Sequence, residues 1–169
     1  MENVIQIIKS HNKSVTSPKV AQTLPCNCRN KSTCPLDGKC RSKSVIYKCV
    51  VTTPNDRKVY LGLTEDEWKK RYYNHTQSFR NTKYQKSTVL SSYIWELKNE
   101  TGEMPELTWS IEKSIPAYSN ISKRCLLCLH EKLAIVTYER PSELLNKRSE
   151  LISKCRHENK YLLSNYNND

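Results

Sequence analysis

The chain has 169 residues, with 28 Lys and Arg against 17 Asp and Glu and a formal net charge of +11. This length fits one domain of ordinary size with an added terminal segment. No apolar run approaches the roughly 20 residues of a membrane span, and the first residues lack the apolar region of a signal peptide. We therefore expect a soluble intracellular protein that does not contact a membrane.

The positive charge is unevenly distributed along the chain. Lys and Arg outnumber Asp and Glu by 8 to 2 before residue 45, by 10 to 6 from residue 45 to 100, and by 10 to 9 afterwards. A basic excess suits a polyanion, because Lys and Arg gain affinity by releasing the counterions of phosphates. Nucleic acid is the usual polyanion, although membrane surfaces and acidic proteins also compete.

The first part of the chain divides into a tail, a cysteine-rich segment and a hairpin. Residues 1–25 are interpreted as a linker or helical tail. Residues 26–43 contain CNCRNKSTCPLDGKC, which is too short and polar to form an apolar core. Residues 44–53 and 59–63 alternate like two strands, and PNDRK between them predicts the turn of a hairpin.

Strand signals give way to helix signals after Gly62, which permits a close approach or a left-handed backbone. Thr64, followed three residues later by Glu67, predicts a capping box at the start of a helix. On that helix Arg71 and His75 lie one turn apart on the same face, because residues i and i+4 are neighbours on a helix surface.

The second half of the chain alternates between helix and strand patterns. SSYIWELKNE predicts a helix, residues 106–114 a third strand, and residues 122–139 a long helix that begins at an N-cap serine and stops at Pro141. Residues 151–169 are interpreted as a helical extension. The predicted fold class is α+β, with a small three-stranded antiparallel sheet flanked by helices over residues 44–150.

Eight cysteines indicate either disulfides or metal. Without a secretory signal, closely spaced cysteines favour zinc, although a secreted disulfide protein stays open. Two tetrahedral sets are predicted: Cys26, Cys28, Cys34 and Cys40; and Cys125, Cys128, Cys155 and His157. A mixed site of Cys34 and Cys40 with His75 and His157 is the alternative. Cys49 is expected to be a buried apolar residue.

The order of these elements resembles the GIY-YIG endonuclease family. Its first motif would be Val45-Ile46-Tyr47, with valine in place of the glycine, and its second Tyr60-Leu61-Gly62, followed by Arg71 at the family's offset. The resemblance covers roughly residues 44–150. It implies a nuclease-like sheet with an N-terminal zinc-binding extension.

A narrower resemblance is to the endonuclease domain of Penelope-like retroelements. It is carried by CNC and CPLDGKC, by RYYNHTQSFR, by the KRC-x-x-CL segment and by LLNKRSELISKCRH. It implies a nuclear enzyme that nicks double-stranded DNA and leaves a 3′ hydroxyl to prime a fused or associated reverse transcriptase with its RNA. No polymerase motif is visible in this chain.

The resemblance also selects the residues of the catalytic site. Glu131 would hold Mg²⁺ or Mn²⁺, because a hard cation needs an oxygen ligand, and Arg71 would grip the scissile phosphate. Tyr47 is favoured as general base, provided that a metal or Arg71 lowers its pKa, and Tyr60 as a positioning donor.

Two further residues complete the predicted set. His75 would assist proton transfer or bind phosphate, or else ligate zinc, and Asn146 would order the site. The competing hypothesis is a zinc-stabilised DNA-binding module that has lost cleavage. An RNA-binding zinc protein has little support, since the chain has one Phe and lacks an aromatic RNA-binding signature.

Overall fold

A computed structural model describes residues 6, 24–118, 125–147, 151–155 and 157 of this chain. Three antiparallel strands form the sheet, in the order β2-β1-β3. They are β1 (Val45–Thr52), β2 (Arg57–Thr64) and β3 (Glu106–Ser114). The predicted α+β class and the three-stranded antiparallel sheet are therefore confirmed. The predicted tail over residues 1–25 and most of the extension over 151–169 lie outside the described residues.

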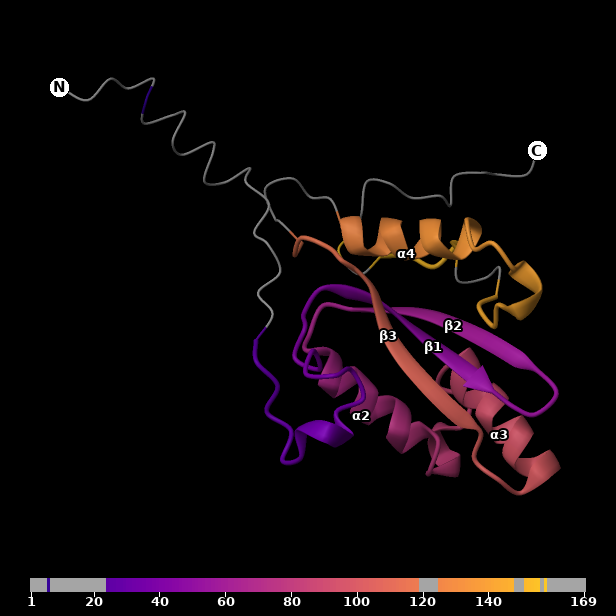
Figure 1. The fold of residues 1–169 in the computed structure, drawn as a ribbon. Helices are drawn as coiled ribbons and strands as arrows, with labels where there is room; N and C mark the ends of the chain where they lie inside the picture. The colour runs from indigo at the N-terminus through magenta and orange to yellow at the C-terminus, as the bar shows by residue number, and fades with distance from the viewer. Residues whose placement is uncertain (1–5, 7–23, 119–124, 148–150, 156, 158–169) are drawn as a thin grey trace, which may run out of the picture.

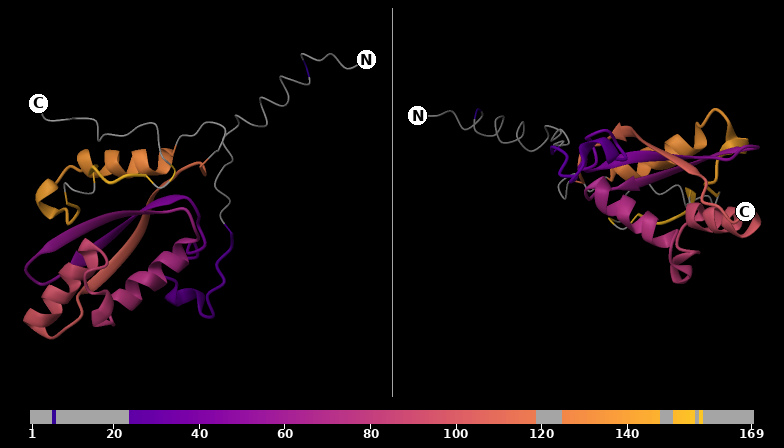
Figure 2. Two further views of the ribbon diagram at one scale, coloured as in Figure 1. Left: turned by 180° about the vertical axis from the view of Figure 1, so that it is seen from behind. Right: turned by 60° about the horizontal axis from the view of Figure 1, so that its bottom comes forward.

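The helices cover both faces of the sheet. Helices α2 (Trp68–Ser78) and α3 (Val89–Thr101) lie on one side, and α4 (Leu126–Val136) lies on the other, as Figure 1 and the turned views of Figure 2 show. Three short 3₁₀ turns, η1 (Lys31–Thr33), η2 (Thr82–Tyr84) and η3 (Pro141–Glu143), join these elements. The sheet thus has a core on each face.

Strand alternation divides the side chains of β1 between the two cores. Tyr47, Cys49 and Val51 point toward α2 and α3, where they pack with Trp68 and Trp109 in one buried cluster. Ile46 points the other way, into a second cluster with Ile115, Cys125, Leu127 and Cys155 beneath α4. Cys49 is fully buried, as its sequence context predicts.

The long helix predicted over 122–139 is shorter in the structure. Cys125 is the N-cap in extended conformation, and α4 ends at Val136, before Pro141, where Thr137 leaves the helical conformation. The serine predicted as N-cap lies at 122, outside the described residues. Proline therefore does not set the end of this helix.

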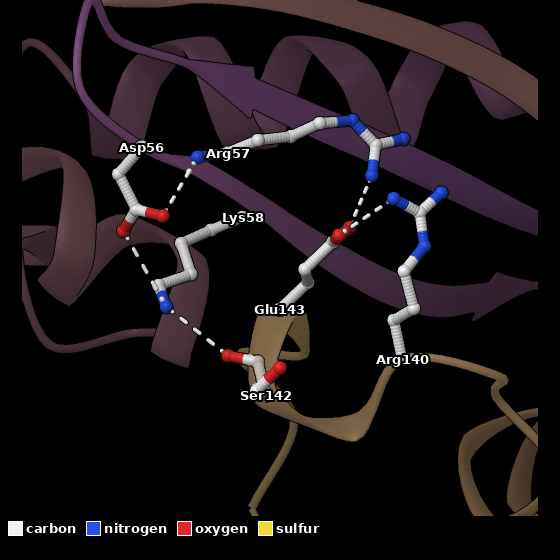
Figure 3. A network of polar contacts seen from close by, with 6 residues as sticks. All are labelled: Asp56, Arg57, Lys58, Arg140, Ser142 and Glu143. Carbon is white, nitrogen blue, oxygen red and sulfur yellow. Dashed lines mark hydrogen bonds and ion pairs between the residues drawn. The ribbon is translucent and has the colours of Figure 1, made fainter.

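The free edge of β2 is covered by the segment that follows α4. Leu144 pairs with Val59 in an isolated parallel bridge, and the Leu145 amide donates to the Val59 carbonyl at 2.8 Å. Charged side chains reinforce this contact: Arg57 and Arg140 both bind the Glu143 carboxylate, and Lys58 donates to the Ser142 carbonyl at 3.1 Å (Figure 3). The edge strand that carries Tyr60 is thus paired on both sides over part of its length.

No helix in the described part of the chain has the length and apolar character to cross a membrane.

Candidate active site

Gly62 is needed because an aromatic ring lies directly over it. It pairs with Tyr47 across the β1–β2 ladder, so both residues face the same side of the sheet. A Cβ at Gly62 would lie 2.5 Å from Tyr47 Oη and 3.0 Å from Tyr60 Cε1. Any larger residue would push the two tyrosines out of place. Of the two reasons that sequence offers for this glycine, close approach is the correct one.

Tyr47 connects the two residues that the sequence placed one turn apart on a helix. Arg71 Nε donates to Tyr47 Oη at 3.0 Å, and Tyr47 Oη lies 2.8 Å from His75 Nε2. Since Arg71 is the donor to this oxygen, the phenol proton points to His75, which accepts it as a neutral ring. Arg71 and His75 share a helix face, as predicted, and from that face both side chains contact the Tyr47 hydroxyl.

His75 belongs to the core. Its side chain is 2% exposed and packs against Phe79 and Trp109, with ring centroids 6.0 and 5.4 Å away. Burial, with a smaller contribution from the Arg71 charge, lowers the pKa of His75 from 6.5 to about 3. A buried neutral ring is not a cation for phosphate, so the geometry favours a positioning role for His75, and its predicted part in proton transfer or phosphate binding stays a prediction.

Tyr47 is also fully buried, and this bears on its predicted role as general base. Burial raises the pKa of Tyr47 to about 12, although the Arg71 charge and hydrogen bond act in the opposite direction. Arg71 alone therefore does not produce the phenolate, and the proton stays on Tyr47 in preference to His75. The role of general base was predicted on condition that a metal or Arg71 lowers the pKa of Tyr47, and Arg71 by itself does not lower it below its ordinary value.

A cleft of about 460 Å³ lies beside β2 and brings three predicted residues together. Tyr60, Arg71 and Glu131 line it, from β2, α2 and α4 respectively. The Arg71 guanidinium also interacts with the Tyr60 phenol. The Glu131 carboxylate is close enough for its charge to raise the pKa of Tyr47. Tyr60 is the tyrosine that reaches the cleft, whereas Tyr47 lies behind Arg71.

Asn146 does not line the cleft but holds the strand beside it. Its Oδ1 accepts from the Leu61 amide and its Nδ2 donates to the Leu61 carbonyl, both at 2.8 Å. The side chain therefore imitates a neighbouring strand at the open edge of β2. Leu61 lies between Tyr60 and Gly62, so Asn146 is placed to order the site through the backbone of β2, as predicted.

The four cysteines of the N-terminal segment converge as the sequence predicted. The ligand atoms of Cys26, Cys28, Cys34 and Cys40 lie within 4.8 Å of one another. Cys40 Sγ is 3.7 Å from Cys28 Sγ and 3.5 Å from Cys26 Sγ. In a tetrahedral site with Zn–S bonds of about 2.3 Å the sulfur atoms lie about 3.8 Å apart. This cluster could hold a metal such as zinc.

Local backbone supports a thiolate in this cluster. Burial raises the pKa of Cys34, but the backbone N–H groups of Leu36 and Gly38, together with the Cys26 and Cys40 thiols, lower it to about 7. The Gly38 amide lies 3.3 Å from Cys34 Sγ, in a turn where Asp37 and Gly38 both have positive φ. Gly38 is thus required by the turn that presents Cys34.

The cysteine segment also starts the helix that carries Arg71. The first amides of α2, those of Trp68 and Lys69, donate to the carbonyls of Ser42 and Cys40 at 2.8 and 2.7 Å. These bonds satisfy donors that every helix start leaves without an internal partner. The segment is therefore continuous with the domain rather than an appended module, and Cys34, Leu36 and Cys40 belong to the main core.

The predicted capping box at Thr64 and Glu67 is wrong. Thr64 is the last residue of β2, and Glu67 is the N-cap of α2 without a side-chain cap bond. The Glu67 carboxylate instead accepts two bonds from Arg41, at 3.1 and 3.0 Å. Because the Glu67 carboxylate forms a bidentate ion pair with Arg41 of the cysteine segment, it does not cap the helix.

Three of the four residues of the second predicted metal set come together, and the mixed alternative does not form. Ligand atoms of Cys125, Cys155 and His157 lie within 4.8 Å of one another, and the Cys128 thiol interacts with both of these cysteines. Cys34 and Cys40 lie with the N-terminal cysteines, and His75 Nε2 is engaged by Tyr47. The mixed site and the zinc-ligand role of His75 are therefore excluded by geometry.

Sequence reasoning missed several residues that build this region. Glu65 binds His157, Arg41 binds Glu67, and the buried Lys132 donates to the Ser153 carbonyl. All three contacts join segments far apart in the chain, so no local spacing announces them. Arg41 lies one residue after Cys40, which ties the end of the cysteine segment to α2.

Comparisons with family models, with curated proteins and with solved structures found no match for this chain.

Proposed function

We propose that this chain is a metal-dependent DNA endonuclease of the GIY-YIG type. The observation that carries the proposal is the convergence of Tyr60, Arg71 and Glu131, from three separate elements, on one cleft. Hydrolysis of a phosphodiester needs a cation against the phosphate oxygens, a polar group near the attacking water and a ligand for a hard metal. These three side chains have that chemistry.

Arg71 is the residue that meets the scissile phosphate. Its Nε is bound to Tyr47, so a bidentate contact to phosphate would use the two Nη atoms at the end of the fork. The side chain is half-buried and bonded on its inner side to Tyr47, which in turn is bonded to His75. A braced guanidinium loses little freedom when it binds, which favours stabilisation of developing charge.

Glu131 is the protein ligand for a divalent cation such as Mg²⁺ or Mn²⁺. Its carboxylate lines an open cleft with room for waters and phosphate oxygens. Mg²⁺ binds in such places with few protein ligands, because waters and substrate oxygens complete its coordination. When bound, the ion would supply Lewis-acid stabilisation of the phosphate oxygens. Arg71, which lines the same cleft, would add its positive charge.

The two tyrosines have different roles in this proposal. Tyr60 reaches the cleft and contacts the attacking water or the phosphate, whereas Tyr47 fixes the orientation of Arg71 from behind. The pKa of about 12 keeps Tyr47 neutral as a hydrogen-bond acceptor for Arg71. The roles predicted from sequence, with Tyr47 as base and Tyr60 as positioning donor, are thus exchanged.

DNA has a path past Arg71 on both sides. A second hollow, of about 450 Å³, shares Arg71 and Asn74 with the cleft and is lined further by uncharged polar groups and Tyr84. Two hollows that meet at an arginine suit the nucleotides on either side of one phosphate. Bases stack on exposed aromatic rings, and Tyr84 is 44% exposed.

The biological setting follows the narrower resemblance. We propose that the enzyme nicks double-stranded DNA in the nucleus as the endonuclease of a Penelope-like retroelement, so that the 3′ hydroxyl primes a reverse transcriptase on its RNA. Zinc in the N-terminal cysteine cluster would order the start of α2. The alternative is an inactive zinc-stabilised DNA-binding module.

Incubation of the full chain with supercoiled plasmid and Mg²⁺ tests the proposal. Conversion to open circles that stops when the metal is chelated with a magnesium-binding carboxylate chelator and returns with added Mg²⁺ is the expected result. Tyr60→Phe should slow nicking strongly with unchanged stability, whereas Tyr47→Phe should also lower stability because the buried His75 nitrogen loses its partner. Binding of plasmid without nicks would favour the inactive module.

A further inference from the structure

The second cysteine–histidine cluster lies inside the wall of the proposed catalytic cleft. The same cleft that contains Tyr60, Arg71 and Glu131 is also lined by four potential metal ligands: Cys125, Cys128, Cys155 and His157. The first two ligands begin α4, and the last two come from the segment near the C-terminus. A metal at this place would join the start of α4 to the segment near the C-terminus.

Three of the four donor atoms, those of Cys125, Cys155 and His157, lie within 4.8 Å of one another, and the Cys128 thiol interacts with both cysteines. Cys155 Sγ lies 3.9 Å from His157 Nδ1, close to the separation of two ligands on one tetrahedral ion. The His157 amide donates to Cys155 Sγ at 3.4 Å, a bond that favours a thiolate. Three sulfurs and one imidazole form a soft donor set that selects zinc over Mg²⁺.

The histidine is oriented by a carboxylate on its other side. His157 Nε2 lies 3.2 Å from Glu65 Oε1, and its ring stacks on Tyr118 with centroids 4.0 Å apart. Metal-bound histidines commonly donate their second nitrogen to a carboxylate, which fixes the tautomer and raises the ligand's basicity. Glu65 is thus placed to leave Nδ1 for the metal.

The surroundings also support a built site. Cys125 and Cys155 are buried with Ile46, Ile115 and Leu127, so the thiols lie against an apolar wall. Lys132 is buried and donates to the Ser153 carbonyl at 2.7 Å, which fixes the segment that presents Cys155. The segment that presents Cys155 is therefore anchored to α4.

We propose that Cys125, Cys128, Cys155 and His157 bind one zinc ion, with Glu65 supporting His157, and that this ion fixes the first turns of α4 and hence Glu131. Cys128 and Glu131 are three residues apart on α4, so they share a helix face. The zinc-binding part stands independently of the catalytic assignment. The link to Glu131 rests on the proposed nuclease function.

Zinc content of the full chain tests the site without any assay of activity. Wild-type protein should contain two zinc ions, while Cys155→Ser and His157→Ala should contain one. His130→Ala is the matched control, because His130 is on α4 outside the cluster, and it should retain two. One ion in the wild type that persists in Cys155→Ser, or two ions in His157→Ala, would overturn the site.

A milder variant keeps the test valid if a ligand variant fails to fold. Glu65→Gln should weaken one of the two zinc affinities by about 10–100-fold, measured by competition with a chromogenic chelator. Asp66→Asn, a change at the neighbouring exposed carboxylate, should leave both affinities unchanged. Equal affinities in Glu65→Gln and the wild type would contradict the role given to Glu65.

The nicking assay separates the two parts of the proposal. If the wild type nicks plasmid, His157→Ala should nick at least about 10-fold more slowly with unchanged DNA affinity, because a misplaced group near the reaction centre reduces the rate. A wild-type rate in zinc-depleted His157→Ala would overturn the link to Glu131. Failure of the wild type to nick would instead contradict the nuclease assignment and leave the zinc result standing.

Discussion

At the scale of single residues, the site depends on one arginine held from behind. Tyr47 accepts from Arg71 and donates to His75, and Gly62 leaves the space in which the Tyr47 ring lies. The two aromatic groups are buried and neutral, and Arg71 is the charged member of the group. The chemistry assigned to Arg71 therefore needs the shape of its guanidinium as well as its charge.

Replacement of Arg71 by lysine separates shape from charge. Arg71→Lys keeps the positive charge but loses both the fork and the bond to Tyr47, so nicking should slow by roughly 10²–10³-fold. Arg80→Lys, at an exposed arginine just after α2, is the matched control and should nick as the wild type does. If Arg71→Lys nicked at the wild-type rate, the site would need only charge there.

Acidification should destabilise the protein through His75. The pKa of His75 is about 3 in the folded protein, against an ordinary value of 6.5 that applies in the unfolded chain. Between these values the unfolded chain binds a proton that the folded chain does not, so the free energy of unfolding falls as the pH falls. The slope from this group is at most about 1.4 kcal/mol per pH unit.

Urea unfolding at pH 7.0, 6.0 and 5.5 measures this effect. His75→Gln, which can still accept from Tyr47, should lose less stability over this range than the wild type does. His130→Gln, at a partly buried histidine, should follow the wild type more closely. Parallel curves for His75→Gln and the wild type would mean that the buried ring is not what resists acid.

At the scale of elements, local signals predicted the parts of the fold that depend on the chain nearby. Alternation gave β1, β2 and β3 within a few residues, because each strand has one face on a core. The predicted capping box of α2 failed, because Glu67 binds Arg41 and the first amides of α2 bind the cysteine segment. Contacts between distant segments override the capping pattern, and such contacts cannot be predicted from the spacing of neighbouring residues.

The candidate site shows the same division. Types of residue and their elements could be read from the sequence, and Tyr60, Arg71 and Glu131 do line one cleft. The burial of Tyr47 and His75 could not be predicted, because it depends on packing against Trp109 and Phe79. The proposed contacts with water and phosphate are therefore assigned to Tyr60 and Arg71, which line the cleft, and not to the buried Tyr47 and His75.

Loss of the N-terminal metal cluster should loosen the start of α2. Cys34→Ser removes one ligand, and the amides of Trp68 and Lys69, which donate to the carbonyls of Ser42 and Cys40, should exchange with solvent about 10-fold faster. The Ser91 amide in α3 is the internal control, because the Thr88 side chain caps it. Amide exchange followed by NMR should show equal Ser91 rates. Unchanged rates at Trp68 would mean that the cluster does not support the helix.

At the scale of the whole molecule, the charge distribution would determine how the proposed DNA substrate is held. The net charge of +11 is concentrated in the first two thirds of the sequence, and Lys70 and Arg71 line the cleft itself. Such a surface binds phosphates without regard to base sequence. The cleft also contains carboxylates, so the proposed binding and cleavage would depend on different groups.

Affinity for a duplex of arbitrary sequence should fall steeply and linearly on a plot of log K against log salt concentration. Lys70→Gln should reduce the slope by about 1, because it removes one phosphate contact. Lys113→Gln, an exposed lysine on β3, should leave the slope unchanged. Fluorescence anisotropy between 50 and 200 mM salt, the range over which such losses are usually seen, measures these slopes. A flat dependence would contradict phosphate binding.

The nicking rate of Glu131→Ala tests the central claim most directly. Removal of the proposed metal ligand takes little volume from the core, since Glu131 is only half-buried at the cleft. The variant should fold and bind DNA as the wild type does, while Mg²⁺-dependent nicking of supercoiled plasmid falls by at least about 10²-fold. Glu139→Ala, at an exposed glutamate beyond the end of α4, should nick normally. Nicking by Glu131→Ala at the wild-type rate would contradict the account.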